Sequence, residues 1–177
     1  PDSGHCPAGT YVAGQALNLT ASPGPHYAIS GWSGTNNDGS TLSTNTATMP
    51  TSPPGEHAVS VTYTAICYSL TTSVLPTVGG SISRSQPPNC PDPARATEYL
   101  AGTEVSLTAN PSAGYAFTNW SGGLTGSINP SALTMNMDYV GTNAVKATFE
   151  KACHLLSLSH TPPEGGSVPT AVPSKSA

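Results

Sequence analysis

Short segments in which polar and apolar residues alternate recur along the chain, and each one predicts a β-strand. The segments are residues 16–21, 28–32, 58–65, 68–75, 81–85, 104–109, 116–120 and 143–150. Turn-forming Gly, Pro, Asn and Ser separate them. Gly79 and Gly80 lie between two of these segments, which predicts a β-hairpin at residues 68–85. The pattern predicts an all-β fold built from short strands.

The alternating pattern also repeats along the chain, with a period of 86 to 88 residues. Residues 11–34 match residues 99–122 without a gap, and residues 67–70 match residues 153–156. One complete unit occupies residues 67–152. Residues 1–66 form a unit that lacks its first hairpin, and residues 153–177 form the first hairpin of a further unit. The sequence therefore predicts two tandem small β modules in a circularly permuted repeat frame.

Composition supports this fold and excludes several functions. Only 8% of the 177 residues are charged, while Gly and Pro contribute 18 each and Ser and Thr together contribute 46. Few residues favour helix interiors, which argues against a helical bundle. A net charge of -4 with five Lys and Arg leaves no basic patch for nucleic acid. No apolar run approaches the roughly 20 residues that a transmembrane helix needs.

The motifs of the complete unit point to a known family. They are Gly79-Gly-Ser, Ala101-Gly-Thr-Glu-Val-Ser-Leu-Thr-Ala, Gly114-Tyr-Ala-Phe-Thr-Asn-Trp-Ser-Gly, Asn129-Pro, Leu133-Thr-Met and Val145-Lys-Ala-Thr-Phe. In this order they resemble the divergent internalin-type B-repeats, which occur in tandem in secreted and surface-attached bacterial proteins. The resemblance implies a β-grasp-like fold, an extracellular or cell-surface location, no cofactor and no catalytic residues.

Four cysteines without a CxxC motif indicate disulfides and an oxidising compartment. Cys67 enters the predicted hairpin of the complete unit and Cys90 leaves it, so we expect these two to be bonded. By repeat equivalence, we expect Cys153 to pair with Cys6 of another copy.

Two aromatic pairs recur at equivalent positions and are candidate core anchors: Trp32 with Trp120, and Tyr27 with Tyr115. The alternative for the tryptophans is glycan stacking on exposed indoles. Asn18 and Asn119 begin N-glycosylation sequences.

Other candidate chemistry is weaker. The five histidines have no HxH or HxxxH spacing for a metal, and we expect them to be ordinary surface residues; they are His5, His26, His57, His154 and His160. The run 36–38 imitates a calcium loop but has too few acidic ligands, which favours a polar turn. No serine lies in a G-x-S-x-G elbow, so we expect no enzyme.

Two classes of function fit these observations. The first is a structural subunit of an extracellular filament, in which residues 153–177 of one copy complete the unit 1–66 of the next copy. The apolar residues of this donor segment are Leu155, Leu156, Leu158 and Val168. Alternatively, the chain is a segment of one long covalent array, or its tail folds back on its own first unit. The second class is a carbohydrate- or receptor-binding adhesin that uses loops 34–45 and 122–131.

Overall fold

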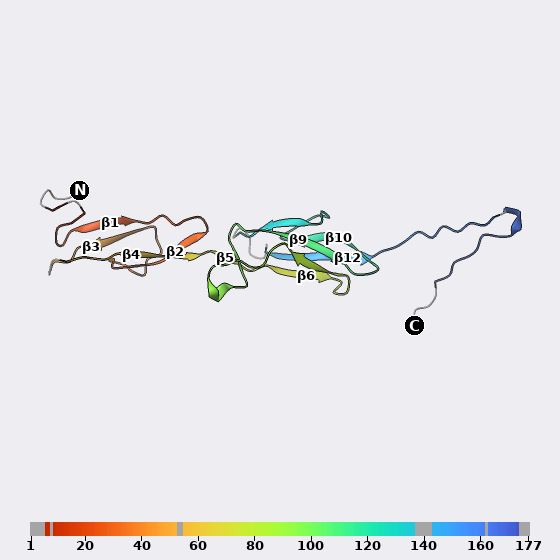
Figure 1. Cartoon of the computed structure of the whole chain (residues 1–177), viewed down its shortest axis with the longest axis horizontal. Coiled ribbons are helices and arrows are strands. Elements are labelled where there is room, and N and C mark those ends of the chain that lie inside the picture. The colour runs from red at the N-terminus through yellow and green to blue at the C-terminus, as the bar shows by residue number, and fades with distance from the viewer. Residues whose placement is uncertain (1–5, 8, 53–54, 137–142, 162, 174–177) are drawn as a thin grey trace.

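The computed structural model describes residues 6–7, 9–52, 55–136, 143–161 and 163–173. Figure 1 shows two β modules that follow one another along a long axis, with the segment after the second module extending beyond it. Helical structure in the described residues is limited to two 3-10 turns, η1 (Pro93–Arg95) and η2 (Pro163–Gly165). The predicted all-β fold is confirmed. Within these residues, no helix has the length and apolar character needed to cross a membrane.

The second module contains two three-stranded sheets. Its strands are β5 (Cys67–Tyr68), β6 (Thr71–Leu75), β7 (Gly80–Arg84), β8 (Tyr99–Leu100), β9 (Glu104–Pro111), β10 (Tyr115–Gly122), β11 (Ser131–Thr134) and β12 (Ala144–Lys151). One sheet has the order β10-β12-β6 and the other the order β11-β9-β7. β6 runs parallel to β12, so the module pairs an early strand with its last one, while the other ladders are antiparallel.

The inward side chains of both sheets form one core between them. It includes Tyr99, Val105, Leu107, Trp120 and Met135, each at most 1% exposed. Alternation in β9 and β12 places every second residue in this core, as a half-buried strand requires.

The predicted hairpin at residues 68–85 is wrong. β6 and β7 follow each other along the chain, but β6 pairs with β12 and β7 pairs with β9, in different sheets. A Cβ added at Gly79 would lie 2.8 Å from Phe149 Cβ, and one at Gly80 would lie 2.6 Å from Phe149 Cζ. The two glycines thus let the chain pass close to the Phe149 ring as it crosses between the sheets, instead of closing a two-stranded turn.

The N-terminal module contains only half of this architecture. Its strands are β1 (Ala16–Thr20), β2 (Tyr27–Ser33), β3 (Thr44–Thr48) and β4 (Ser60–Ala65). β1 pairs with β3 and β2 pairs with β4, matching the pairs β9-β11 and β10-β12 of the second module. Among the described residues, no strand occupies the positions of β6 and β7 in this module. Its buried cluster is correspondingly small and consists of Ala21, Ile29 and Trp32.

Candidate functional site

The N-terminal module has an open cavity of 640 Å³ between β1, β3 and the segment 55–59 that precedes β4. Among the residues that line it are Tyr11, Leu17, Leu19, Ala47, Met49 and Val59. Glu56 and His57 also line it, and the His57 Nε2 atom lies 2.9 Å from the carbonyl oxygen of Gly34. The lining is therefore apolar along the strands, with polar groups from residues 56–57.

Except for Ala47, the six residues named above are more exposed than their counterparts in the second module. Tyr11 is 44% exposed where Tyr99 is 0% exposed, and Val59 is 36% exposed where Val145 is 2% exposed. The counterparts of the six residues named above are Tyr99, Val105, Leu107, Leu133, Met135 and Val145, all in the core. The cavity thus occupies the place of a core that β6, β7 and the chain before them complete in the second module.

Two strands near this cavity have a free edge: β1, which lines the cavity, and β4, which begins directly after the lining residue Val59. Among the described residues, β4 pairs only with β2 and β1 pairs only with β3, so each of these strands has one edge without a partner. The Gln15 carbonyl and the Ala21 N–H bond to the β3 side, at Met49 and Ser43. Because backbone groups alternate in direction along a strand, those of Asn18 and Thr20 point to the opposite edge. Such unpaired edges are templates for pairing with another strand.

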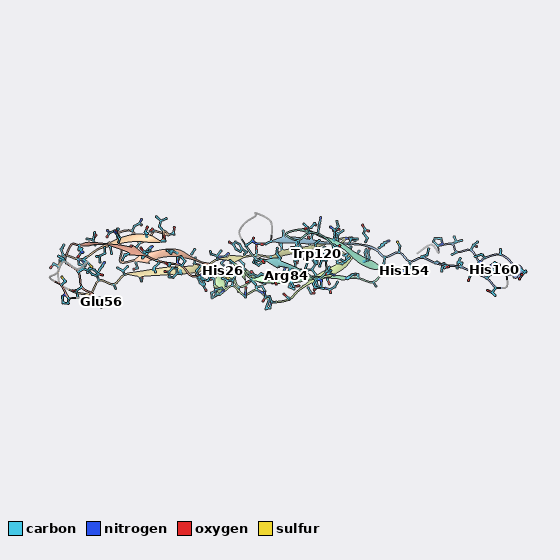
Figure 2. The ribbon with its side chains drawn as sticks, turned by 90° about the horizontal axis from the view of Figure 1, so that it is seen from above. His26, Glu56, Arg84, Trp120, His154 and His160 are labelled. Carbon is cyan, nitrogen blue, oxygen red and sulfur yellow. A yellow bond between two sulfur atoms is a disulfide. The ribbon has the colours of Figure 1, made fainter. Side chains whose placement is uncertain are left out.

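The C-terminal segment, residues 153–173, extends away from both modules (Figure 1). Its described residues contain no strand, so the predicted hairpin is not formed there. Its apolar side chains are exposed: Leu155 97%, Leu156 64%, Leu158 38% and Val168 47%. Figure 2 places Glu56, at the cavity, near one end of the molecule and His160 near the other. The described residues of the tail, 153–161 and 163–173, do not fold back on the first module of their own chain.

The structure joins Cys67 to Cys90 through a disulfide, with the two Cα atoms 5.9 Å apart. The bond connects β5 to the loop between β7 and β8. Closing a loop of this size stabilises the fold by roughly 3 kcal/mol in the chain-entropy model. Cys6 and Cys153 are free thiols, and Cys153 is exposed. Their pairing between copies stays a prediction.

Both tryptophans lie in the interior. Trp120 is 1% exposed and donates from Nε1 to the Ile128 carbonyl at 2.9 Å. Trp32 is 8% exposed and donates to the Leu42 carbonyl at 3.1 Å. Neither indole offers an open face for a sugar ring.

The two tyrosines differ. Tyr115 packs against the core of the second module, but Tyr27 is 39% exposed and is not a core residue, contrary to the prediction. Tyr27 begins β2 at the edge of its module and lines a surface pocket with Tyr63 and Pro91.

Residues 36–38 form a polar turn. The Asp38 carboxylate accepts from the backbone N–H of Thr35 at 2.7 Å and from the Thr35 hydroxyl at 2.8 Å. These hydrogen bonds, the backbone one first, lower the pKa of Asp38 below its ordinary value. The described residues contain no group of three or more His, Cys, Asp or Glu placed to hold a metal ion.

The lowered pKa of Asp38 predicts that this turn loosens in acid. A carboxyl whose pKa is lower in the folded state stabilises the fold above its unfolded pKa, and this contribution is lost as the pH falls through the folded value. We expect the amide of Thr35 to exchange faster below pH 4, roughly the unfolded pKa, while Asp38→Asn makes exchange independent of pH in this range once the intrinsic chemical rate is divided out. Amide hydrogen exchange measures both, and an identical pH profile in the variant would contradict the assignment.

The remaining candidate residues are dispersed. Asn18 and Asn119 are exposed on β1 and β10, so both glycosylation sequences are accessible, and their use stays a prediction. His26, His57, His154 and His160 lie on different parts of the chain, and His5 is outside the described residues. Residues 1–4 and 174–177, which belong to the predicted acceptor and donor units, also lie outside the described residues.

The donor segment was predicted from the sequence, but the cavity that lacks an occupant was not. The signal was available, because the cavity residues are repeat equivalents of apolar strand positions 99–107 and 133–145. Burial of those positions could not be read from the alternation alone, since it depends on which strands cover them.

Comparison with known families agrees with the tandem architecture. The model of the divergent InlB B-repeat domain matches the chain twice, at residues 3–67 and 70–153. No curated protein and no solved structure matches the chain significantly. Repeats of this kind are typical of bacterial surface proteins, and the disulfide between Cys67 and Cys90 fits an extracellular location. With both modules covered by the match, the chain belongs to the divergent InlB B-repeat domain family.

Proposed function

We propose that the protein is a structural component of an extracellular fibre, in which the C-terminal segment of one copy occupies the cavity and the free strand edges of the N-terminal module of the next. The contact uses different surfaces of the two copies, so it does not close on itself and extends into a filament. It is a case of β-strand addition. The same residues would meet whether the copies are separate chains or successive parts of one longer chain.

The observation that carries the proposal is the pair Leu70 and Leu156. Leu70 precedes β6, is 7% exposed, and belongs to the core cluster that contains Val105, Leu107 and Val145. Leu156 is its repeat equivalent, 86 residues later, and is 64% exposed. The equivalents of Val105, Leu107 and Val145 are Leu17, Leu19 and Val59, and all three line the open cavity. An apolar cavity and an exposed apolar side chain of the matching repeat position are thus present on the same chain, at opposite ends.

Residues 58–62, which are the start of β4 and the two residues before it, fit residues 157–161. In the second module β6 pairs with β12 in parallel, with Thr72 opposite Val145 and Val74 opposite Ala147. The same register places Leu158 opposite Val59 and His160 opposite Val61. Thr72 and Val74 are the half-buried positions of β6, so Leu158 would face inward and bury more apolar surface than Thr72 does.

Residues 19–23, which are the end of β1 and the three residues after it, fit residues 166–170. β7 pairs with β9 so that Ile82 lies opposite Ala109, and the same register places Val168 opposite Ala21. Residue 169 is a proline, which cannot donate a hydrogen bond to the ladder. Pro169 is the equivalent of Ser83, whose N–H faces β9 in the observed register, so the pair of Pro169 with Thr20 would lack one ladder hydrogen bond.

A disulfide between Cys153 and Cys6 of the next copy would make the contact covalent. Cys67 lies opposite Leu100 in the β5-β8 ladder, and the same register places Cys153 opposite Val12. Cys6 is near this point in sequence, and its thiol is free. The bond would form under oxidising conditions and would lock an interface that strand pairing has already aligned.

The test compares the full chain with a chain of residues 1–152. We expect the full chain to form fibres by electron microscopy and a ladder of covalent oligomers on non-reducing gels. We expect residues 1–152 to stay monomeric, while Cys153→Ser removes the ladder but keeps fibres that dissociate more easily on dilution.

A full chain that stays monomeric at high concentration, or one with an intramolecular bond between Cys6 and Cys153, would contradict assembly between separate chains. A control with Cys67→Ser and Cys90→Ser should keep the ladder if Cys6 and Cys153 form it.

A further inference from the structure

A single residue, Ile66, separates β4 of the N-terminal module from β5 of the second module. Its N–H donates to the His26 carbonyl at 2.8 Å, and its carbonyl accepts from the Ala101 N–H at 2.8 Å. His26 precedes β2, and Ala101 follows β8. The connecting residue is therefore hydrogen-bonded to both modules, and the linker has no free length over which to bend.

Arg95 closes over this connection from the loop between β7 and β8. Its guanidinium donates to the carbonyl of Ala65 at 3.5 Å and to the carbonyl of Cys67, one on each side of Ile66. The Glu98 carboxylate forms an ion pair of 2.6 Å with the same guanidinium. One side chain thus contacts the last residue of the N-terminal module and the first residue of the second.

The loop that carries Arg95 is itself held in place. The Asp92 carboxylate caps the η1 turn by accepting from the Ala94 N–H at 2.9 Å. The Glu98 carbonyl accepts from the N–H groups of Asn89 and Cys90. Cys90 is bonded to Cys67, so the loop is covalently attached next to the junction that Arg95 covers.

His26 reinforces the junction from the other side. Its backbone has a φ of 65°, and its ring lies against Gly102, where an added Cβ would overlap ring atoms. Figure 2 shows His26 at the boundary between the two modules. Gly102 has a φ of +80°, so a glycine is required there both for the backbone and for the ring.

We infer that this arrangement is a built-in stiff joint, in which Arg95 and His26 hold the two modules at one fixed orientation. The chain is then a rigid two-module rod and not two beads on a flexible linker. Independent of any assembly, this predicts one narrow distribution of distances between the modules.

The equivalent joint after the second module lacks both side chains. The hydrogen bond from the Ala152 N–H to the Gly114 carbonyl, at 2.8 Å, repeats the one between Ile66 and His26. Residue 114 is glycine, however, and the stretch between Cys6 and Tyr11 is four residues shorter than that between Cys90 and Tyr99, without Arg or Glu. If copies join as proposed above, stiff joints within each copy alternate with looser joints between copies.

Electron paramagnetic resonance distance measurements test the stiff joint. Spin labels at Ser22→Cys and Ser112→Cys report one distance between the modules, in a chain that also carries Cys6→Ser, Cys153→Ser and Leu156→Asp. The last change keeps chains apart, so the result does not depend on whether assembly occurs. We expect a single narrow distribution in this background and one at least twofold wider with Arg95→Ala.

Arg84→Ala is the matched control. Arg84 also donates to a backbone carbonyl, that of Leu70, but it does so inside the second module. We expect Arg84→Ala to leave the distance distribution narrow. We also expect His26→Ala to widen the distribution. His26 belongs to the N-terminal module, so this effect cannot come from misfolding of the loop that carries Arg95. A background distribution that is already broad, or variants at Arg95 and His26 that both stay narrow, would overturn the inference.

Discussion

A chain with Leu156→Asp will stay monomeric at concentrations at which the unmodified chain forms oligomers. The side chain at this position is expected to enter the cavity of the next copy, because its equivalent Leu70, 7% exposed, belongs to the core of the second module. A carboxylate without a partner in an apolar site costs about 3–5 kcal/mol. Since each 1.4 kcal/mol is tenfold in affinity, the interface should weaken by at least about 100-fold. Analytical ultracentrifugation over a concentration series measures the change.

Leu155→Asp is the matched control for this prediction. It introduces the same charge one residue away, but its repeat equivalent is Ser69, which is exposed in the second module. We therefore expect Leu155→Asp to assemble nearly as well as the unmodified chain. Because both leucines are exposed in the single chain, neither change should alter the fold of the two modules. Equal loss of assembly in the two variants would show that the segment acts by general hydrophobicity and not through the cavity.

Trp120→Ala will unfold the second module under conditions in which Trp32→Ala leaves that module intact. Trp120 is 1% exposed in the larger core cluster, and its ring centroid lies 5.0 Å from that of Phe117. Removing a buried tryptophan costs about 3–5 kcal/mol, which is most of the stability of a small domain. Trp32 lies in a smaller cluster beside an open cavity, so its removal should cost less than half as much.

Urea denaturation followed by circular dichroism and by fluorescence tests this difference. Each variant retains one tryptophan, so the remaining fluorescence reports the module that was not changed. Ile128→Ala, at a residue 77% exposed, should change the free energy of unfolding by no more than about 0.5 kcal/mol. If both tryptophan variants destabilised their modules equally, the N-terminal module would not be the incomplete one.

The sequence by itself determined the strands whose alternation is strong. Segments 104–109 and 143–150 are predicted with nearly the bounds of β9 and β12, because each carries three inward apolar residues. β3 and β11 were missed: residues 44–48 are Thr and Asn with one Ala, residues 131–134 are only four residues long, and each strand has a single buried side chain, Ala47 and Leu133. Such strands exist because a neighbouring strand supplies their hydrogen bonds, which local sequence does not reveal.

The sequence also determined the tandem architecture and the order of its parts. A repeat of 86 to 88 residues places equivalent side chains at equivalent positions, and this physical equivalence is what relates Leu156 to Leu70 and Cys153 to Cys67. The pairing of Cys67 with Cys90 was predicted from the two ends of one segment, and the structure joins these cysteines although that segment is not a hairpin.

Only the tertiary structure decided which strands pair and what remains open. Alternation specifies the two faces of a strand but not which strand lies beside it. It therefore could not predict the parallel pairing of β6 with β12 or the crossing between sheets at Gly79 and Gly80. The cavity, the free edges of β1 and β4 and the contacts of Arg95 at the junction all depend on distances between residues far apart in sequence. They arise because the first strands of a module close its core, and in the N-terminal module no described strand takes that place.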